Sequence, residues 1–179
     1  MSNDIKIIDN FLPEDDFKEI QENILSPFFP WYFNINVLYD EPEMARKDNL
    51  YNYQLVHGFY KNWRPTSDHI GKIDKLINKI NPAAILRIKA NLNPVTDKRI
   101  VHGMHIDFIT PCRTGIFYIN NNNGITVFED GTEIESVANR FINFPNHMMH
   151  SGSTCTDKKA RFVININYIE RTTDDPRQI

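Results

Sequence analysis

The chain has 179 residues, of which 41% are hydrophobic and 24% charged, and its formal net charge is -3. This length predicts a single domain, residues 1–179, with enough residues to bury a sizeable core. Because the chain is slightly acidic and its lysines and arginines are scattered, we expect neither a nucleic-acid partner nor binding to an anionic membrane.

The cysteines and the apolar segments indicate the compartment. Cys112 and Cys155 lie far apart and form no C-x-x-C pair, so we expect two free thiols. The segment MSNDIKIIDNFLPEDD has no apolar core of signal-peptide length, and no apolar run in the sequence could span a bilayer. The sequence therefore predicts a soluble, cytoplasmic protein.

Two helices are expected in the first half of the chain. The first covers residues 13–25 and begins with a proline and three acids, which suit the positive end of a helix. The second covers residues 66–80, with a Thr-Ser pair at its start and an Asn-Pro pair directly after its end. Their apolar stripes are Phe17, Ile20 and Ile24 in the first and Ile70, Ile73, Ile77 and Ile80 in the second.

Most of the remaining chain is expected to form strands, because short segments rich in β-branched and aromatic residues alternate with turn residues. The predicted strands are WYFNINVLY (31–39), YQLVHGFY (53–60), AILRIKANL (84–92), GMHIDF (103–108), TGIFYIN (114–120), ITVFED (125–130), NRFINF (139–144) and RFVININYI (161–169). The run NNNNG (120–124) is predicted to be a turn. Helices followed by six or more short strands predict a mainly β, α+β fold with helices packed on a β-sandwich or jelly roll.

The stretch HGMHIDF sets polar groups in a segment predicted to be a buried strand. Side chains two apart share one face of a strand, so His105 and Asp107 are expected to point the same way. Such a pair offers two ligands to a divalent metal, although a histidine hydrogen-bonded to its neighbouring carboxylate is the alternative. By the same alternation His102 faces away from His105, and we expect it to be a satisfied structural histidine.

A third ligand has to come from another part of the chain. The segment NFPNHMMHSG supplies His147 and His150, and Arg161 then opens a strongly apolar strand. Two histidines and one carboxylate form the facial triad of non-haem Fe(II) oxygenases. An arginine facing the same cavity could bind a dicarboxylate through bidentate hydrogen bonds; the alternative is a surface ion pair at a strand end.

The order of these segments resembles the 2-oxoglutarate- and Fe(II)-dependent dioxygenases, most closely the prolyl-hydroxylase-like branch, which includes small forms encoded by phages. The resemblance lies in the ordered set H-x-D, YIN, ITVF, FPN, HSG and RFVININY. It implies a double-stranded β-helix (jelly roll) core with N-terminal helices, the metal and co-substrate part covering about residues 84–169. It also implies Fe(II), 2-oxoglutarate and O2, with ascorbate as a further cofactor.

Carried over onto matching positions, the resemblance makes His105, Asp107 and His150 the iron ligands. Arg161 becomes the partner of the distal carboxylate of 2-oxoglutarate. His150 is preferred to His147 because small residues follow it, as in the H-x-G form of the family, and His147 is expected in a cap or turn.

The resemblance also suggests further co-substrate contacts. Tyr118 matches a tyrosine whose hydroxyl contacts the co-substrate, with a core aromatic role as the alternative. Asn165 shares a strand face with Arg161 and is a candidate second contact, while Asn167 is expected near the substrate mouth. Where relatives often carry a tyrosine before Pro or Gly, this chain has Asn93, which we expect, with Asn91, to hydrogen-bond the co-substrate.

The implied activity is decarboxylation of 2-oxoglutarate to succinate and CO2, coupled to hydroxylation of a substrate C–H bond. A small molecule, peptide or protein is the expected substrate, and peptidyl proline is the leading class. The aromatic-rich residues 31–63 are expected at the substrate rim, or else as core aromatics with a surface loop at 41–49. The alternatives are a non-catalytic metal-binding jelly roll and a cupin-type metalloenzyme that does not use 2-oxoglutarate; neither needs Arg161.

Overall fold

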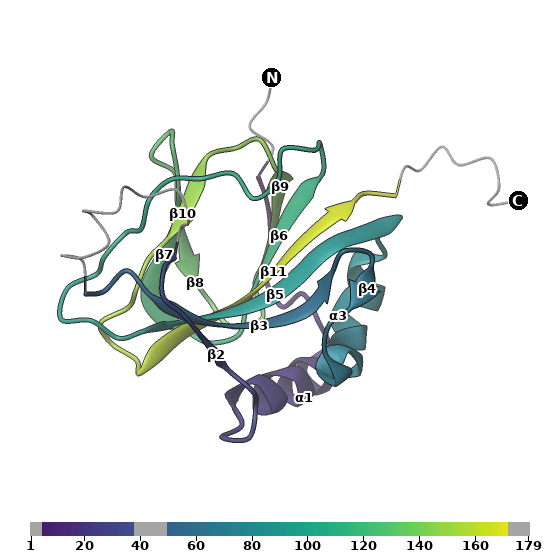
Figure 1. Ribbon diagram of the computed structural model, residues 1–179, viewed down its shortest axis with the longest axis horizontal. Coiled ribbons are helices and arrows are strands. Elements are labelled where there is room, and N and C mark those ends of the chain that lie inside the picture. The colour runs from purple at the N-terminus through teal and green to yellow at the C-terminus, as the bar shows by residue number, and fades with distance from the viewer. Residues whose placement is uncertain (1–4, 38–49, 172–179) are drawn as a thin grey trace, which may run out of the picture.

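The computed structural model describes residues 5–37 and 50–171 (Figure 1). Its helices are α1 (Glu14–Leu25), the 3₁₀ helix η1 (Asp68–Ile73) and α3 (Asp74–Ile80). Its strands are β1 (Lys6–Ile8), β2 (Tyr32–Asn34), β3 (Gln54–Lys61), β4 (Arg64–Pro65), β5 (Ala84–Pro94), β6 (Arg113–Tyr118), β7 (Asn122–Phe128), β8 (Glu133–Ser136), β9 (Phe141–Pro145), β10 (His150–Gly152) and β11 (Ala160–Ile169). No helix in these two ranges is long and apolar enough to cross a membrane.

The strands form two antiparallel sheets. The larger sheet has the order β1-β9-β6-β11-β5-β3-β2, with β4 paired to β3, and the smaller has the order β10-β7-β8. In the larger sheet, β5 and β11 form the longest pair, from Ala84↔Ile169 to Pro94↔Ala160, with one shift of register between Asn167 and Tyr168. The mainly β, jelly-roll-like arrangement with packed helices is therefore confirmed.

Each face of the larger sheet buries its own apolar core. Figure 1 shows the helices together on one side of this sheet, whereas β7, β8 and β10 lie on the other. The helix-side core includes Phe17, Ile20, Ile24, Ile73 and Leu76 from the helices and Phe59, Ile88, Ala90, Phe117, Ile164 and Ile166 from the sheet. The core between the sheets includes Ile116, Tyr118, Phe128, Ile134, Ile142, Phe144, Met148 and Val163.

The first helix agrees with its prediction and the second does so in part. α1 buries the predicted stripe, and Pro13 precedes it as its N-cap. The second helical segment ends as predicted, because Asn81 takes a left-handed conformation at φ 50° directly after α3. Its first half, however, is a 3₁₀ helix, begun by the Ser67 hydroxyl, which accepts a hydrogen bond from the His69 amide. Gly71 in that half is a poor α-helix former.

Several strand predictions need correction. GMHIDF is not a strand, because its pairing within the described ranges is limited to the isolated bridge His105↔His150, with a second isolated bridge, Val101↔Ser153, just before it. Its apolar residues Met104 and Ile106 are not buried, with exposed fractions of 38% and 39%. The asparagine run is a turn only at its start, since Asn122 already begins β7. The short strands β1, β4, β8 and β10 were not predicted.

The two cysteines and the segment 31–49 can be compared with their predictions. Cys112 and Cys155 are free thiols, as expected. Of the predicted strand 31–39, only Tyr32–Asn34 is a strand, and residues 38 and 39 lie outside the described ranges. The expected surface loop at 41–49 also lies outside them.

Candidate active site

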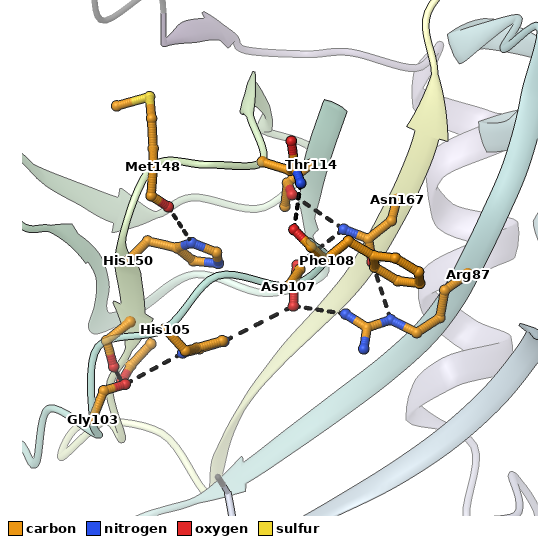
Figure 2. Close-up of polar contacts among 12 residues, drawn as sticks. Arg87, Gly103, His105, Asp107, Phe108, Thr114, Met148, His150 and Asn167 are labelled. Atoms are coloured by element: carbon orange, nitrogen blue, oxygen red, sulfur yellow. Dashed lines mark hydrogen bonds and ion pairs between the residues drawn. The ribbon is translucent and has the colours of Figure 1, made fainter. Parts of the chain in front are cut away.

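Three side chains from distant segments converge beside the larger sheet. His105 and Asp107 come from the loop between β5 and β6, and His150 opens β10. One ligand atom from each of the three lies within 4.8 Å of the others. Figure 2 shows the two imidazole rings and the carboxylate turned toward one another, with His105 Nε2 at 3.9 Å from Asp107 Oδ1. The structure thus brings together the three residues predicted as metal ligands.

Backbone contacts fix both histidines in position. The amides of His105 and His150 each donate to the other residue's carbonyl over 3.0 Å, which ties the loop to β10. The Nδ1 atom of His105 lies 3.3 Å from the Gly103 carbonyl, and that of His150 lies 3.1 Å from the Met148 carbonyl. Because a carbonyl only accepts, each Nδ1 carries the proton and each Nε2 keeps its lone pair for a metal. Among described groups, the buried His150 Nε2 has no hydrogen-bond partner.

Asp107 is held by two residues of the adjoining strands. Its Oδ1 accepts a 2.6 Å hydrogen bond from Arg87 Nη2 on β5, and its Oδ2 accepts one of 3.1 Å from Asn167 Nδ2 on β11. Arg87 Nε also donates to Asn167 Oδ1 over 3.0 Å, so the three residues form one network (Figure 2). Asn167 was predicted near the substrate mouth; instead it is fully buried behind Asp107.

The electrostatics of the three residues suit metal binding. Burial alone would raise the pKa of Asp107, but Arg87, His150 and Lys89 together hold it well below its usual range. Burial lowers the pKa of His105, and the neighbouring His150 lowers it further. Burial also lowers the pKa of His150. At neutral pH the site therefore offers two neutral imidazoles and one carboxylate, which are the protonation states that bind a divalent metal. The residues present thus fit a facial-triad metal such as Fe(II).

A cavity extends from His105 and His150 to Arg161. Its remaining walls are Val37, Gln54, Lys89, Asn91, Asn93, His102, Ile116, Thr126, Gly152, Val163 and Asn165. The predicted Asn93 and Asn165 are both buried there, and the buried Oδ1 of Asn165 has no hydrogen-bond partner among the described residues. The cavity therefore joins the two histidines of the triad to most of the predicted co-substrate residues.

Arg161 is a buried cation at the far end of this cavity. Only 2% of it is exposed, and it donates to two neutral hydroxyls, Ser136 Oγ at 2.8 Å and Thr126 Oγ1 at 2.9 Å. In the part of the chain that the structure describes, no carboxylate lies within ion-pair distance of it. Burial lowers the pKa of Arg161. A buried guanidinium without a counter-ion is costly, so this end of the cavity favours an anionic ligand.

Tyr118 contacts Arg161 with its ring and Thr126, a hydrogen-bond partner of Arg161, with its hydroxyl. The Arg161 Cζ lies 5.5 Å from the centre of its ring, and its hydroxyl donates to Thr126 Oγ1 over 2.8 Å. Its side chain is fully buried between the sheets, and burial raises the pKa of its hydroxyl. A direct contact between the Tyr118 hydroxyl and a co-substrate stays a prediction.

The prediction for His102 was wrong, whereas that for His147 is confirmed. His102 lines the same cavity as His105, and its buried Nε2 has no partner among the described groups. Strand alternation does not apply, because residues 102–108 are not a strand. Burial lowers the pKa of His102 to about 4, so its ring is neutral at pH 7. His147 lies exposed in the turn after β9.

The network around Asp107 contains a residue that the sequence analysis missed, Arg87. The signal was present: Arg87, Lys89, Asn91 and Asn93 alternate with apolar residues along β5, as one polar strand face requires. Thr126 and Ser136, which bond Arg161, gave no such signal, because hydroxyl residues are common in strands.

Comparison with known proteins extends these observations. No family model matches the sequence, and a search of curated proteins finds no match. Similar solved structures include a prolyl hydroxylase from Trichoplax adhaerens in complex with a hypoxia inducible factor oxygen degradation domain peptide fragment. Its TM-score is 0.61 at 17% identity, over 94% of this chain and 84% of that one.

Two further structures show the same likeness. A prolyl-4-hydroxylase from Pseudomonas putida has a TM-score of 0.57 at 12% identity, over 94% of both chains. A non-haem α-ketoglutarate-dependent epimerase of nogalamycin biosynthesis has a TM-score of 0.63 at 9% identity, over 94% of this chain and 79% of that one. The fold is therefore like that of 2-oxoglutarate/Fe(II) oxygenases, including two prolyl hydroxylases.

Proposed function

We propose that this chain is a 2-oxoglutarate- and Fe(II)-dependent oxygenase. His105, Asp107 and His150 hold the iron, and Arg161 binds the distal carboxylate of 2-oxoglutarate. The two packed sheets support a double-stranded β-helix core at about residues 84–169, within a single cytoplasmic domain of residues 1–179.

The buried charge of Arg161 is the observation that carries this proposal. A site that bound only a metal would gain nothing from an unpaired guanidinium at the opposite end of its cavity, and burying one is costly. A dicarboxylate that reaches from the metal to Arg161 supplies the missing anion through strong, charge-assisted hydrogen bonds. Gly124 and Gly152 leave room for the arginine, since a Cβ atom there would lie 2.7 Å from its Cδ and 3.1 Å from its Nη1.

The chain's own residues divide the work of such a reaction. Bound Fe(II) supplies the oxidation, using O2 and 2-oxoglutarate to form succinate and CO2 and to oxidise a substrate C–H bond. Arg87 and Asn167 hold the Asp107 carboxylate ionised and oriented, and the Gly103 and Met148 carbonyls fix the two ring tautomers. Asn93, across from Arg161 on β5, and Asn165 offer further hydrogen bonds to the co-substrate. Tyr118 fixes Arg161 through Thr126.

Hydroxylation of a peptide or protein, with proline as the leading target residue, is the substrate class that we propose. The Trichoplax adhaerens enzyme of the same fold is bound to a peptide fragment. Near His105 in the chain, the side chains of Val101, Met104, Ile106 and Ile109 are exposed by 38–94%, and they offer apolar groups to such a substrate.

Succinate release tests the reaction class. Purified protein with Fe(II), ascorbate, O2 and 2-oxoglutarate is expected to form succinate, slowly alone and faster with an accepted substrate. The Arg161→Ala variant should lose this turnover at moderate 2-oxoglutarate while it still binds the metal. A cupin-type enzyme or a non-catalytic metal-binding jelly roll would instead bind metal but not 2-oxoglutarate, and Arg161→Ala would change neither property.

A further inference from the structure

Lys89 is a second cation in the cavity and forms no hydrogen bond in the network of Arg87, Asp107 and Asn167. It lies in the middle of β5 with its side chain on the cavity wall. Within the described ranges it makes no hydrogen bond or ion pair, although Arg87, on the same face of β5, is paired with Asp107. Lysine on a solvated strand face needs no partner, but Lys89 is partly buried and faces inward.

The register of β5 against β11 places Lys89 at the metal end of the cavity. Arg87 pairs with Asn167, Lys89 with Asn165, Asn91 with Val163, and Asn93 with Arg161. Paired residues share a face, and successive pairs on that face lie about 6.6 Å apart along the strand. Along the same face of β5, Lys89 is therefore the next residue after Arg87, which bonds Asp107. Asn93, the residue opposite Arg161, lies two such positions further along the strand.

The charges around Lys89 agree with this position. Its pKa is lowered to about 8, mainly by burial and also by the nearby Arg87, while Asp107 opposes the shift. Lys89 in turn helps to lower the pKa of Asp107, His105 and His150. Beside it, the buried Oδ1 atoms of Asn91 and Asn165 have no partner among the described groups. This end of the cavity thus has an uncompensated cation and open hydrogen-bonding groups.

We propose that the Lys89 ammonium binds the carboxylate of 2-oxoglutarate that lies at the metal. The cavity then holds the co-substrate between two cations, with Arg161 on the distal carboxylate and Lys89 on the proximal one. This assignment rests on the proposed function, because it needs 2-oxoglutarate in the cavity. It makes Lys89 a determinant of affinity for the 2-oxo acid end of the co-substrate, whereas Arg161 selects for a second, distal carboxylate.

Calorimetric titration of the Mn(II)-loaded protein with 2-oxoglutarate tests the assignment without turnover. Lys89→Met, which removes the charge and keeps most of the length, should raise the Kd for 2-oxoglutarate about tenfold to a hundredfold, as expected for the loss of a charge-assisted hydrogen bond. Lys89→Arg should stay much closer to the wild type. Lys61→Met is the matched control, because it removes an exposed charge that lies near Lys89 but outside the cavity. The Kd for Mn(II) should not rise in any of these variants.

The outcomes separate this assignment from the function on which it rests. If wild-type protein binds 2-oxoglutarate and Arg161→Ala weakens it, but Lys89→Met does not, the role of Lys89 is overturned and the proposed function stands. A loss of Mn(II) affinity equal to the loss of 2-oxoglutarate affinity would mean that Lys89 only supports the fold, which also overturns the assignment. Should Lys89→Met fold poorly, Lys89→Gln gives the same comparison. Failure of the wild type to bind 2-oxoglutarate would overturn both proposals.

Discussion

Asp107 is oriented by protein groups on both of its oxygens. Arg87 and Asn167 contact one oxygen each, and the two residues are bonded to each other. Groups that orient a ligand typically contribute about tenfold to a hundredfold to metal affinity. The position of the Asp107 carboxylate thus depends on two strand side chains, Arg87 and Asn167.

Asn167→Ala is therefore expected to weaken Mn(II) binding by about tenfold or more, because Asp107 loses a donor and Arg87 an acceptor. Asn143→Ala is the matched control, since Asn143 Oδ1 accepts a 2.7 Å hydrogen bond from Arg113 Nε outside the site. Both Kd values can be measured by calorimetry. Equal Mn(II) affinity in the wild type and Asn167→Ala would show that this contact does not orient Asp107.

Single residues were predictable where their chemistry is rare. His105, Asp107, His150 and Arg161 stood out because imidazole, carboxylate and guanidinium groups are seldom found among apolar strand residues. The direction of His102 could not be predicted, because it depends on a loop whose conformation is set by its bridges to Ser153 and His150. Arg87 could have been found from the alternation of β5, but nothing in the sequence pairs it with Asp107.

Among the secondary-structure elements, β7 packs tightly against Arg161 at Gly124. A Cβ atom on Gly124 would lie 2.7 Å from Arg161 Cδ, 2.8 Å from Asn122 Oδ1 and 3.0 Å from the Thr154 carbonyl oxygen. The last of these is a backbone atom, so it cannot move aside as a flexible side chain can. The strand comes this close only because residue 124 has no side chain.

Gly124→Ala should therefore lower the free energy of unfolding by about 1–3 kcal/mol, as overpacking in a well-packed interior does. Because Arg161 is displaced, it should also weaken 2-oxoglutarate binding. Gly71→Ala in η1 is the control, since the nearest atom to its Cβ is 3.9 Å away and alanine favours helices. Urea unfolding of both variants measures the difference, and an unchanged Gly124→Ala would contradict the packing described here.

Strands were predictable where the alternation of polar and apolar residues continued over a long segment. The β5 and β11 segments alternate over about ten residues, so both strands and their inner faces could be read from the sequence. HGMHIDF shows the same alternation over fewer residues, yet its strand-like pairing within the described ranges is limited to isolated bridges, one of them to the three-residue strand β10. Such short pairings depend on tertiary contacts that a local pattern does not contain.

At the scale of the whole molecule, buried histidines couple stability to pH. Burial lowers the pKa of His57, His105 and His150, and it lowers that of His102 from 6.5 to about 4. Between these values and 6.5 the unfolded chain binds more protons than the folded chain, so the free energy of unfolding rises with pH. This contribution is complete above pH 6.5 and is lost as the pH falls toward 4.

The metal-free protein should accordingly be less stable at pH 5 than at pH 7.5, by at least about 1 kcal/mol. Urea unfolding with a chelator at both pH values measures this difference. It should shrink in His102→Gln, which removes the largest of these shifts, and should persist in the exposed control His147→Gln. Equal stability at both pH values would contradict the burial of these rings.

The architecture as a whole was largely predictable, because helices followed by many short strands leave few packing arrangements. The pairing of β7, β8 and β10 into a separate small sheet was not, since β8 and β10 are too short to show a pattern. Yet this small sheet supplies His150 and the hydroxyls that hold Arg161. The site therefore lies where the two sheets meet, and its geometry follows from their packing.

A crystal structure with Mn(II) and 2-oxoglutarate tests the central claim most directly. We predict one metal ion bound by His105 Nε2, Asp107 and His150 Nε2, with the distal carboxylate of 2-oxoglutarate within hydrogen-bonding distance of the Arg161 guanidinium. A metal bound elsewhere, or a co-substrate that leaves Arg161 without an anion, would contradict the account.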